Sequence, residues 1–128
     1  MSYSGLYREL PHVFGISSTN IKLSDRRFHI VRYDDIVKFY KETTVNLLTY
    51  FPENFDCDDF ALVVTALFKI NPGWELVCHG YAWSDYHAFN VFKCDKGWFV
   101  AEPQNDKIIP ARDAIANAFY RPTQLIRI

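Results

Sequence analysis

Apolar positions recur at helical spacing in two segments of the sequence. From Asp34 or Asp35 to about Tyr50, apolar side chains alternate with lysines and a glutamate on the other side, which predicts an amphipathic helix. Residues 60–68 form an apolar run without Pro or Gly, and the run ends at the turn signal of residues 71–73. This pattern predicts a second helix with Cys57 in its first turn. Because the run is apolar nearly all round, we expect this helix to lie centrally.

The second half of the chain has the pattern of an antiparallel sheet. Residues 74–83, 87–94 and 98–102 have strand character, and Asp95-Lys96-Gly97 predicts a hairpin between the last two. Further strands are expected at 107–109 and 124–128, with a short helix at 111–120. Residues 1–31 are poorly periodic, and we interpret them as a segment that wraps the core, with a short strand at 27–31. The predicted fold class is α+β, one domain over residues 1–128, with the Cys57 helix packed on the sheet.

Composition excludes several classes of protein. The chain has 128 residues, 49% of them hydrophobic and 17% aromatic, which is enough for a compact core. The net charge is −1 and Lys and Arg form no dense cluster, so we expect no nucleic-acid partner. No apolar run approaches the roughly 20 residues of a membrane span. The absence of a secretory signal and an odd count of cysteines favour a reducing, cytoplasmic location. No CxxC spacing indicates a zinc site.

Three residues have the chemistry of a thiol-based site. Cys57 is predicted at a helix start, where unpaired N–H groups and the helix dipole favour the thiolate. A cysteine nucleophile needs a base to take its proton and a third group to orient that base. His87, at a predicted strand start, and Glu102, at the end of the next strand, can supply these roles.

The register of the hairpin decides whether these residues meet. If Lys93 pairs with Trp98, His87 lies opposite Gln104 and Glu102 is a diagonal neighbour on the same face. A glycine bulge in the turn would instead point Glu102 away. Each residue also fits a purely structural role. Cys57 could be a small buried side chain, His87 a polar strand residue and Glu102 a solvated strand end.

Acidic residues surround the cysteine at positions 56, 58 and 59. Nearby anions raise a thiol pKa, which opposes the effect of the helix start. Asp58 and Asp59 also suit a simple helix-capping role.

Short motifs resemble a known enzyme superfamily. Segment 57–61 (Cys-Asp-Asp-Phe-Ala) is similar to bacterial transglutaminase-like cysteine proteinases. Segments 87–90 (His-Ala-Phe-Asn) and 99–104 (Phe-Val-Ala-Glu-Pro-Gln) resemble the C-terminal protease domain of the Marasmius oreades agglutinin type. The resemblance covers about residues 50–105 and places the chain with the papain-like and transglutaminase-like cysteine peptidases. It implies a papain/transglutaminase-like core.

The resemblance also implies roles for individual residues. Cys57 would be the nucleophile, His87 the general base and Glu102 the orienting acid. Asp58 and Asp59 would take part in calcium binding, although no cofactor is required. No Gln precedes the cysteine as a papain-type oxyanion donor. The supporting residues near the oxyanion are therefore expected to be Asn54 and Gln104.

Three functions follow as alternatives. The first is a thiol-dependent acyl-transfer enzyme, a cysteine peptidase or amidase acting on a peptide or protein substrate. Because the chain is short for a complete substrate cleft, substrate binding in this case could involve a partner or an oligomer. The second is a catalytically silent binding module that uses exposed aromatic side chains. The third is a calcium-dependent structural domain, a weak match because the acids lack calcium-loop spacing. The aromatic residues expected on the binding surface are Trp74, Tyr81, Trp83, Tyr86 and Trp98.

Overall fold

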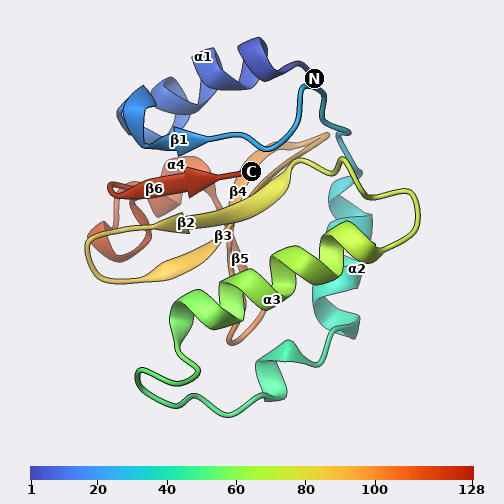
Figure 1. Ribbon diagram of the computed structural model, residues 1–128, viewed down its shortest axis with the longest axis vertical. Coiled ribbons are helices and arrows are strands. Elements are labelled where there is room, and N and C mark those ends of the chain that lie inside the picture. The colour runs from blue at the N-terminus through green and yellow to red at the C-terminus, as the bar shows by residue number, and fades with distance from the viewer.

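Six strands form one mixed sheet, and four α-helices cover its two faces (Figure 1). The structure is a computed structural model that describes residues 1–128. It confirms the α+β class. The helices are α1 (Tyr3–Phe14), α2 (Tyr33–Glu42), α3 (Cys57–Ile70) and α4 (Ala111–Ala114). The strands are β1 (Ile21–Lys22), β2 (His79–Trp83), β3 (Ala88–Cys94), β4 (Gly97–Glu102), β5 (Lys107–Pro110) and β6 (Leu125–Arg127). Single 3₁₀ turns are η1 (Ser18–Asn20), η2 (Val45–Leu47) and η3 (Ala118–Tyr120).

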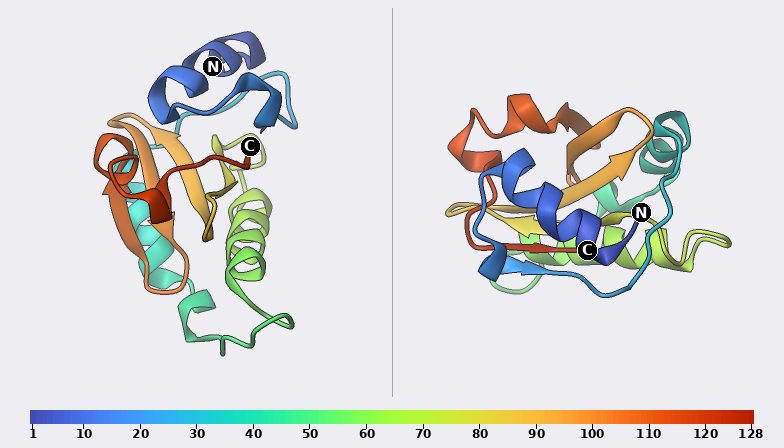
Figure 2. Two further views of the ribbon diagram at one scale, coloured as in Figure 1. Left: turned by 90° about the vertical axis from the view of Figure 1, so that its left-hand side faces the viewer. Right: turned by 90° about the horizontal axis from the view of Figure 1, so that it is seen from above.

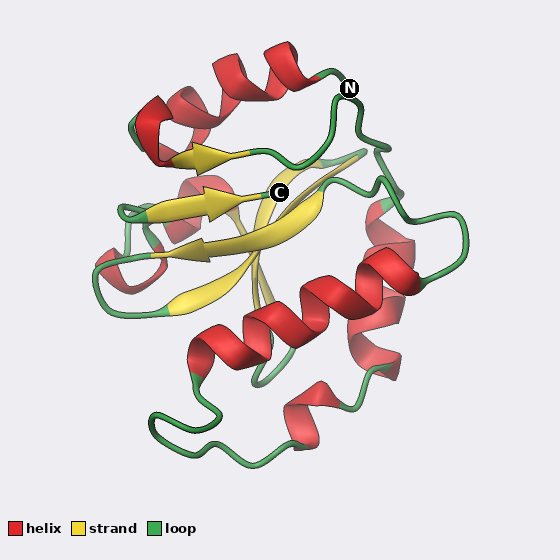
Figure 3. Ribbon diagram, viewed as in Figure 1, coloured by secondary structure: helices red, strands yellow, loops and turns green.

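The sheet has the strand order β1-β6-β2-β3-β4-β5. Strands β2 to β5 form an antiparallel meander, as predicted, and β6 returns to pair antiparallel with β2. The short β1 pairs parallel to β6, so the last strand of the chain lies inside the sheet rather than at its edge. Figure 3 shows these strands as a band between α1 on one side and α2 and α3 on the other.

The two faces of the sheet carry separate hydrophobic cores. Alternate residues of β3 and β4 point to opposite faces, as the pleat of a strand requires. One face packs against α1 and α4 through Phe89, Val91, Trp98 and Val100. The other packs against α2 and α3 through Phe92, Cys94, Phe99 and Ala101. The left view of Figure 2 shows α1 at the top of the molecule and α3 lower down, beside the strands.

The N-terminal segment covers the core, as expected, but it does so with a helix that the sequence analysis did not predict. Leu6, Leu10 and Phe14 repeat at helical spacing and are all buried. Ser2 caps the helix start, and Gly15 ends it in the left-handed conformation with φ 68°. Pro11 lies inside the last turn, where only one hydrogen bond of the helix is lost to it.

Helix α3 begins at Cys57 and ends at Ile70, as predicted. Asp56 and Asp59 form a capping box at its start, with the Asp59 carboxylate accepting the Asp56 N–H at 3.1 Å. The helix is not buried all round, because Leu62 and Ile70 are 53% and 74% exposed. It lies on the surface of the sheet rather than at the centre of the fold.

Other predicted elements are shorter than expected. Helix α2 ends at Glu42, well before Tyr50, because Thr43 leaves the helical conformation and a separate 3₁₀ turn follows. Strand β2 starts only at His79, and residues 111–120 divide into α4 and η3. Residues 27–31 make isolated bridges rather than a strand. None of the helices has the length and apolar character that crossing a membrane requires.

Candidate functional site

The hairpin register brings His87 and Glu102 together. Lys93 pairs with Trp98, the register that the sequence analysis required. The two side chains lie on the same face, and His87 Nε2 is 2.5 Å from Glu102 Oε2. Both are largely buried, with side chains 7% and 5% exposed. Of the two registers that the sequence left open, the structure has the one in which the histidine and the carboxylate meet.

The Glu102 carboxylate accepts hydrogen bonds from three parts of the chain. Its Oε2 atom accepts from His87 and, at 3.1 Å, from the Tyr120 hydroxyl. Its Oε1 atom accepts the backbone N–H of Gln104 at 3.2 Å. Gln104 thus contacts the acid through its backbone rather than through its side-chain amide.

Cys57 is the first residue of α3 and faces the start of β3. Its Sγ atom accepts the backbone N–H of Ala88 at 3.4 Å, and no hydrogen bond joins it to His87. Burial raises the pKa of the Cys57 thiol, and the carboxylates of Asp56 and Asp58 raise it further, against the lowering effect of the Ala88 N–H. The expected preference for thiolate at a helix start is therefore outweighed here.

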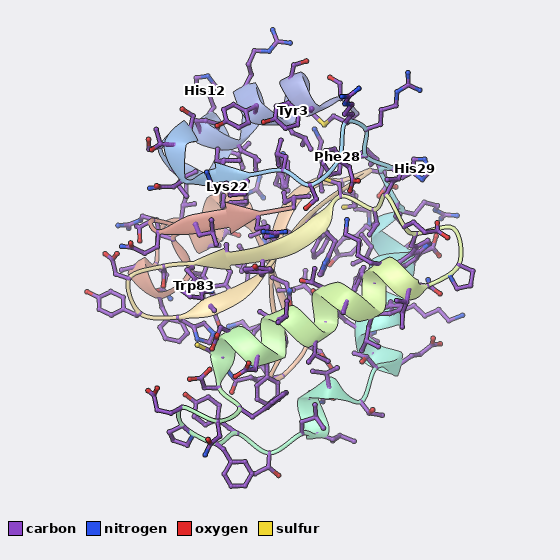
Figure 4. The ribbon with its side chains drawn as sticks, in the orientation of Figure 1. Tyr3, His12, Lys22, Phe28, His29 and Trp83 are labelled. Atoms are coloured by element: carbon purple, nitrogen blue, oxygen red, sulfur yellow. The ribbon has the colours of Figure 1, made fainter.

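A pocket of about 270 Å³ connects Cys57 and His87 with exposed aromatic residues. Trp83, at the end of β2, and Tyr86, in the following loop, are 41% and 71% exposed. Figure 4 labels Trp83 on the side of the molecule where α3 begins. The pocket is lined by Cys57, Asp58, Trp83, Ser84, Asp85, Tyr86, His87 and Ala88.

The other aromatic residues expected on the binding surface lie elsewhere or are covered. Trp98 is only 8% exposed and belongs to the core on the α1 face. Trp74 and Tyr81 are half-buried. The exposed aromatic surface at the pocket consequently comes from Trp83 and Tyr86.

Three acidic residues beside Cys57 lie close enough together to hold a metal ion, and two of them, Asp56 and Asp59, also cap the helix. Carboxylate oxygens of Asp56, Asp58 and Asp59 lie within 4.8 Å of one another. The close approach of the Asp56 and Asp58 carboxyl groups lowers the pKa of Asp56 and raises that of Asp58. Asp59 is occupied by the capping box. Asn54 is exposed in the preceding turn, outside the residues that line the pocket.

The two aromatic residues that pack against the His87 ring were not predicted from the sequence. The Phe119 ring stacks on the His87 ring, with centroids 4.2 Å apart and planes 15° from parallel. The Tyr120 ring packs edge-on against His87 at 5.9 Å. Both belong to η3, which is distant from His87 in the sequence. The aromatic character of the two side chains was the only signal in the sequence that could have indicated this contact.

Comparisons with known proteins identify the fold. Neither a protein-family model nor any curated protein sequence matches the chain. The chain is similar to a solved structure described as a PSL1a–E64 complex, with a TM-score of 0.77 and 20% identity over 98% of this chain and 50% of that one. It is also similar to Polyporus squamosus lectin bound to Neu5Acα2-6Galβ1-4GlcNAc, with a TM-score of 0.59 and 24% identity over 73% of this chain and 39% of that one. The chain spans half the length of these structures or less.

These findings correct the assignment made from the short motifs. One of the two similar solved structures is described as a lectin and neither as a peptidase, so the placement among papain-like and transglutaminase-like cysteine peptidases was wrong. The prediction of a cysteine protease or amidohydrolase, with its hydrolase chemistry, was wrong for the same reason. A papain/transglutaminase-like core is not confirmed, and no comparison supports a peptide or protein substrate. The motifs misled because a few residues around a cysteine and a histidine cover too little of the chain to define a family.

Proposed function

We propose that the chain is a ligand-binding module and that its binding site is the pocket beside the start of α3. The observation that carries the proposal is the meeting of two exposed aromatic side chains, Trp83 and Tyr86, with polar groups in one concavity of about 270 Å³. Concave sites with aromatic walls and a few convergent polar groups are the usual form of ligand sites. The fold shared with a lectin supports a binding role.

Neutral sugar residues are the ligand class that this pocket favours. Indole and phenol rings offer flat apolar faces, with a polar edge, on which the C–H face of a sugar ring can stack. The carboxylates of Asp58 and Asp85 line the same pocket and accept hydrogen bonds from hydroxyl groups. Two carboxylates disfavour an anionic sugar by charge repulsion. We therefore expect neutral glycans to bind in preference to sialylated ones, although the similar lectin is described with a sialylated trisaccharide.

Titration with neutral and sialylated oligosaccharides, followed by NMR or calorimetry, tests this proposal. Trp83→Ala and Tyr86→Ala should each weaken binding by about tenfold or more, because each removes an exposed stacking surface. Tyr3→Ala is the matched control, since Tyr3 is 43% exposed but lies on α1, away from the pocket (Figure 4). Binding that Tyr3→Ala weakens as much as Trp83→Ala, or no binding to any glycan, would refute it.

We also propose roles for the polar residues of the pocket. Glu102 fixes the imidazole of His87 through Nε2, which leaves Nδ1 as the nitrogen available to take a proton from Cys57. The Cys57 sulfur is then a nucleophile toward an electrophilic ligand held in the pocket. The Gln104 backbone N–H supports Glu102. This chemistry would let the module hold a ligand covalently.

Alkylation by iodoacetamide tests the thiol roles. The Sγ–carbon bond forms, iodide leaves and the thiol proton passes to His87. Cys57 should react before Cys78 and Cys94, because it is partly exposed whereas the other two thiols are buried, and burial raises the pKa of Cys78 to about 12. His87→Ala should slow the labelling of Cys57 by about tenfold or more. Equal labelling of Cys57 in wild type and His87→Ala, measured by peptide mass spectrometry, would exclude the thiol roles.

A further inference from the structure

The turn η3 packs directly against the pair formed by His87 and Glu102. Phe119 covers one face of the His87 ring, and Tyr120 reaches past the ring to donate its hydroxyl proton to Glu102 Oε2 at 3.1 Å. That oxygen is the one that holds His87. Two consecutive residues thus contact the pair: Phe119 contacts the His87 ring, and Tyr120 contacts the Glu102 carboxylate.

Ser84 connects η3 to the backbone of His87. Its hydroxyl donates to the Phe119 carbonyl at 2.8 Å and accepts the His87 N–H at 3.0 Å. Ser84 is only 5% exposed, so these bonds are shielded from water. The position of η3 and the position of His87 are therefore set by the same side chain.

The Tyr120 hydroxyl is suited to act as a permanent donor. Burial, and after it the neighbouring Glu102 carboxylate, raise the pKa of Tyr120 to about 12, so the phenol keeps its proton throughout the neutral range. Without this hydroxyl, Glu102 Oε2 would bond to His87 alone. The carboxylate would then be fixed by a single bond on each oxygen, and its plane would be free to turn about them.

We propose that Tyr120 is a positioning residue of the site. Its hydroxyl fixes the plane of the Glu102 carboxylate and, through that carboxylate, holds the His87 ring with Nδ1 available to Cys57. Phe119 fixes the plane of the same ring by stacking. The inference rests on the thiol roles proposed above, and it assigns to η3 a function in the chemistry of the pocket.

Several titratable groups surround His87 and enter the pH dependence of the experiment. Cys57 and Asp58 face it from α3, and Asp85 from the loop after β2. Glu102 faces it from β4 and Tyr120 from η3. Because Tyr120→Phe changes no charge at neutral pH, it leaves the other groups in place and isolates the hydroxyl.

A purely structural role for Tyr120 makes a different prediction. The Tyr120 ring packs edge-on against Phe89 at 5.4 Å and belongs to the hydrophobic core on this face. Tyr120→Phe keeps the ring and its packing. A structural residue would then show at most a change in melting temperature, whereas a positioning residue alters the state of His87.

The experiment compares Tyr120→Phe with wild type by two readouts. The first is the pH profile of Cys57 alkylation by iodoacetamide, and the second is the tautomer of His87 from long-range ¹H–¹⁵N NMR of its ring. Tyr7→Phe is the matched control, because the Tyr7 hydroxyl also makes one hydrogen bond, to the Ser18 carbonyl at 2.8 Å, away from the site. His87→Ala gives the rate without the base.

We expect Tyr120→Phe to slow alkylation by about fivefold, the factor that corresponds to one ordinary hydrogen bond. The His87 ring should lose its single tautomer, while Tyr7→Phe changes neither readout. A wild-type rate and a wild-type His87 spectrum in Tyr120→Phe would overturn the inference, even if the melting temperature falls. If His87→Ala alkylates as fast as wild type, the thiol roles fail, and the His87 spectrum alone then decides whether Tyr120 positions the ring.

Discussion

The buried imidazole of His79 should make the stability of the fold depend on pH. His79 lies on β2 under α2 and α3, stacked on Phe68 with centroids 3.8 Å apart, and Phe92 flanks it at 6.3 Å. Its Nε2 atom bonds to the Tyr40 hydroxyl at 2.8 Å, and its Nδ1 atom is buried without a partner. Burial lowers the pKa of His79 well below 6.5, and the nearby Lys69 ammonium lowers it further. The folded protein therefore holds this histidine neutral.

The sign and size of the effect follow from proton linkage. A histidine whose pKa is lowered by folding takes up its proton in the unfolded chain first, so stability falls as the pH drops below about 6.5. The loss is at most about 1.4 kcal/mol per pH unit. Between pH 6.5 and about pH 4.5 it amounts to about 2 kcal/mol, provided that the native imidazole stays neutral over this range. Above pH 7 the contribution is constant.

Urea unfolding at a series of pH values measures this term. Tyr40→Phe keeps the buried imidazole, and Tyr40→Phe with His79→Phe removes it without leaving a tyrosine hydroxyl unpaired. The single variant should lose about 2 kcal/mol more than the double variant on acidification. Equal losses in the two variants, or a His79 resonance that titrates near pH 6.5 in the native state, would refute the reasoning.

Four other substitutions have defined outcomes, one of them as a control. Gly80→Ala should destabilise the protein by more than about 3 kcal/mol in urea unfolding, because the new Cβ atom would lie 1.8 Å from a backbone oxygen of β6. Gly15→Ala is the control: Gly15 lies in open space at positive φ, so this substitution should cost only about 1 kcal/mol. Glu9→Ala should cost about 1–2 kcal/mol, because the carboxylate accepts a buried indole N–H at 2.8 Å and pairs with a lysine; an unchanged melting curve would contradict this. Asp58→Asn should speed the alkylation of Cys57 at neutral pH, because it removes an anion that raises the thiol pKa; a slower reaction would show that the carboxylate acts otherwise.

The hairpin and α3 could be predicted because their signals are local. In the structure Cys94 pairs with Gly97 and Lys93 with Trp98, and the alternation of side chains then places His87 and Glu102 on one face. The helix after Cys57 is bounded by an acidic start and a Pro-Gly stop, both of which lie next to it in sequence. The sequence thus predicts the hairpin and the helix, but the register on which the His–Glu pair depends is decided only by the structure.

The remaining parts depend on contacts that the local pattern does not contain. Pro11 disfavours a helix in the local sequence, but the burial of Leu10 and Phe14 against the sheet outweighs the lost hydrogen bond. The raised pKa of the Cys57 thiol depends on how deeply the pocket is buried, which sequence does not reveal. The assignment of function failed for a related reason, since short motifs constrain a site but not the protein around it.

The internal position of β6 sets the order in which the molecule can assemble. Ile21 of β1 pairs with Ile126 of β6, nearly the whole chain away, and the Ile128 carbonyl accepts the Ser24 N–H at 2.7 Å. The N-terminal layer of α1 and β1 has no strand to join until residues 125–127 have paired with β2. Contacts of such sequence separation form slowly, because a long loop must close first. We therefore expect the layer of α1 and β1 to dock after β6 has paired with β2, and one face of the sheet stays uncovered until then.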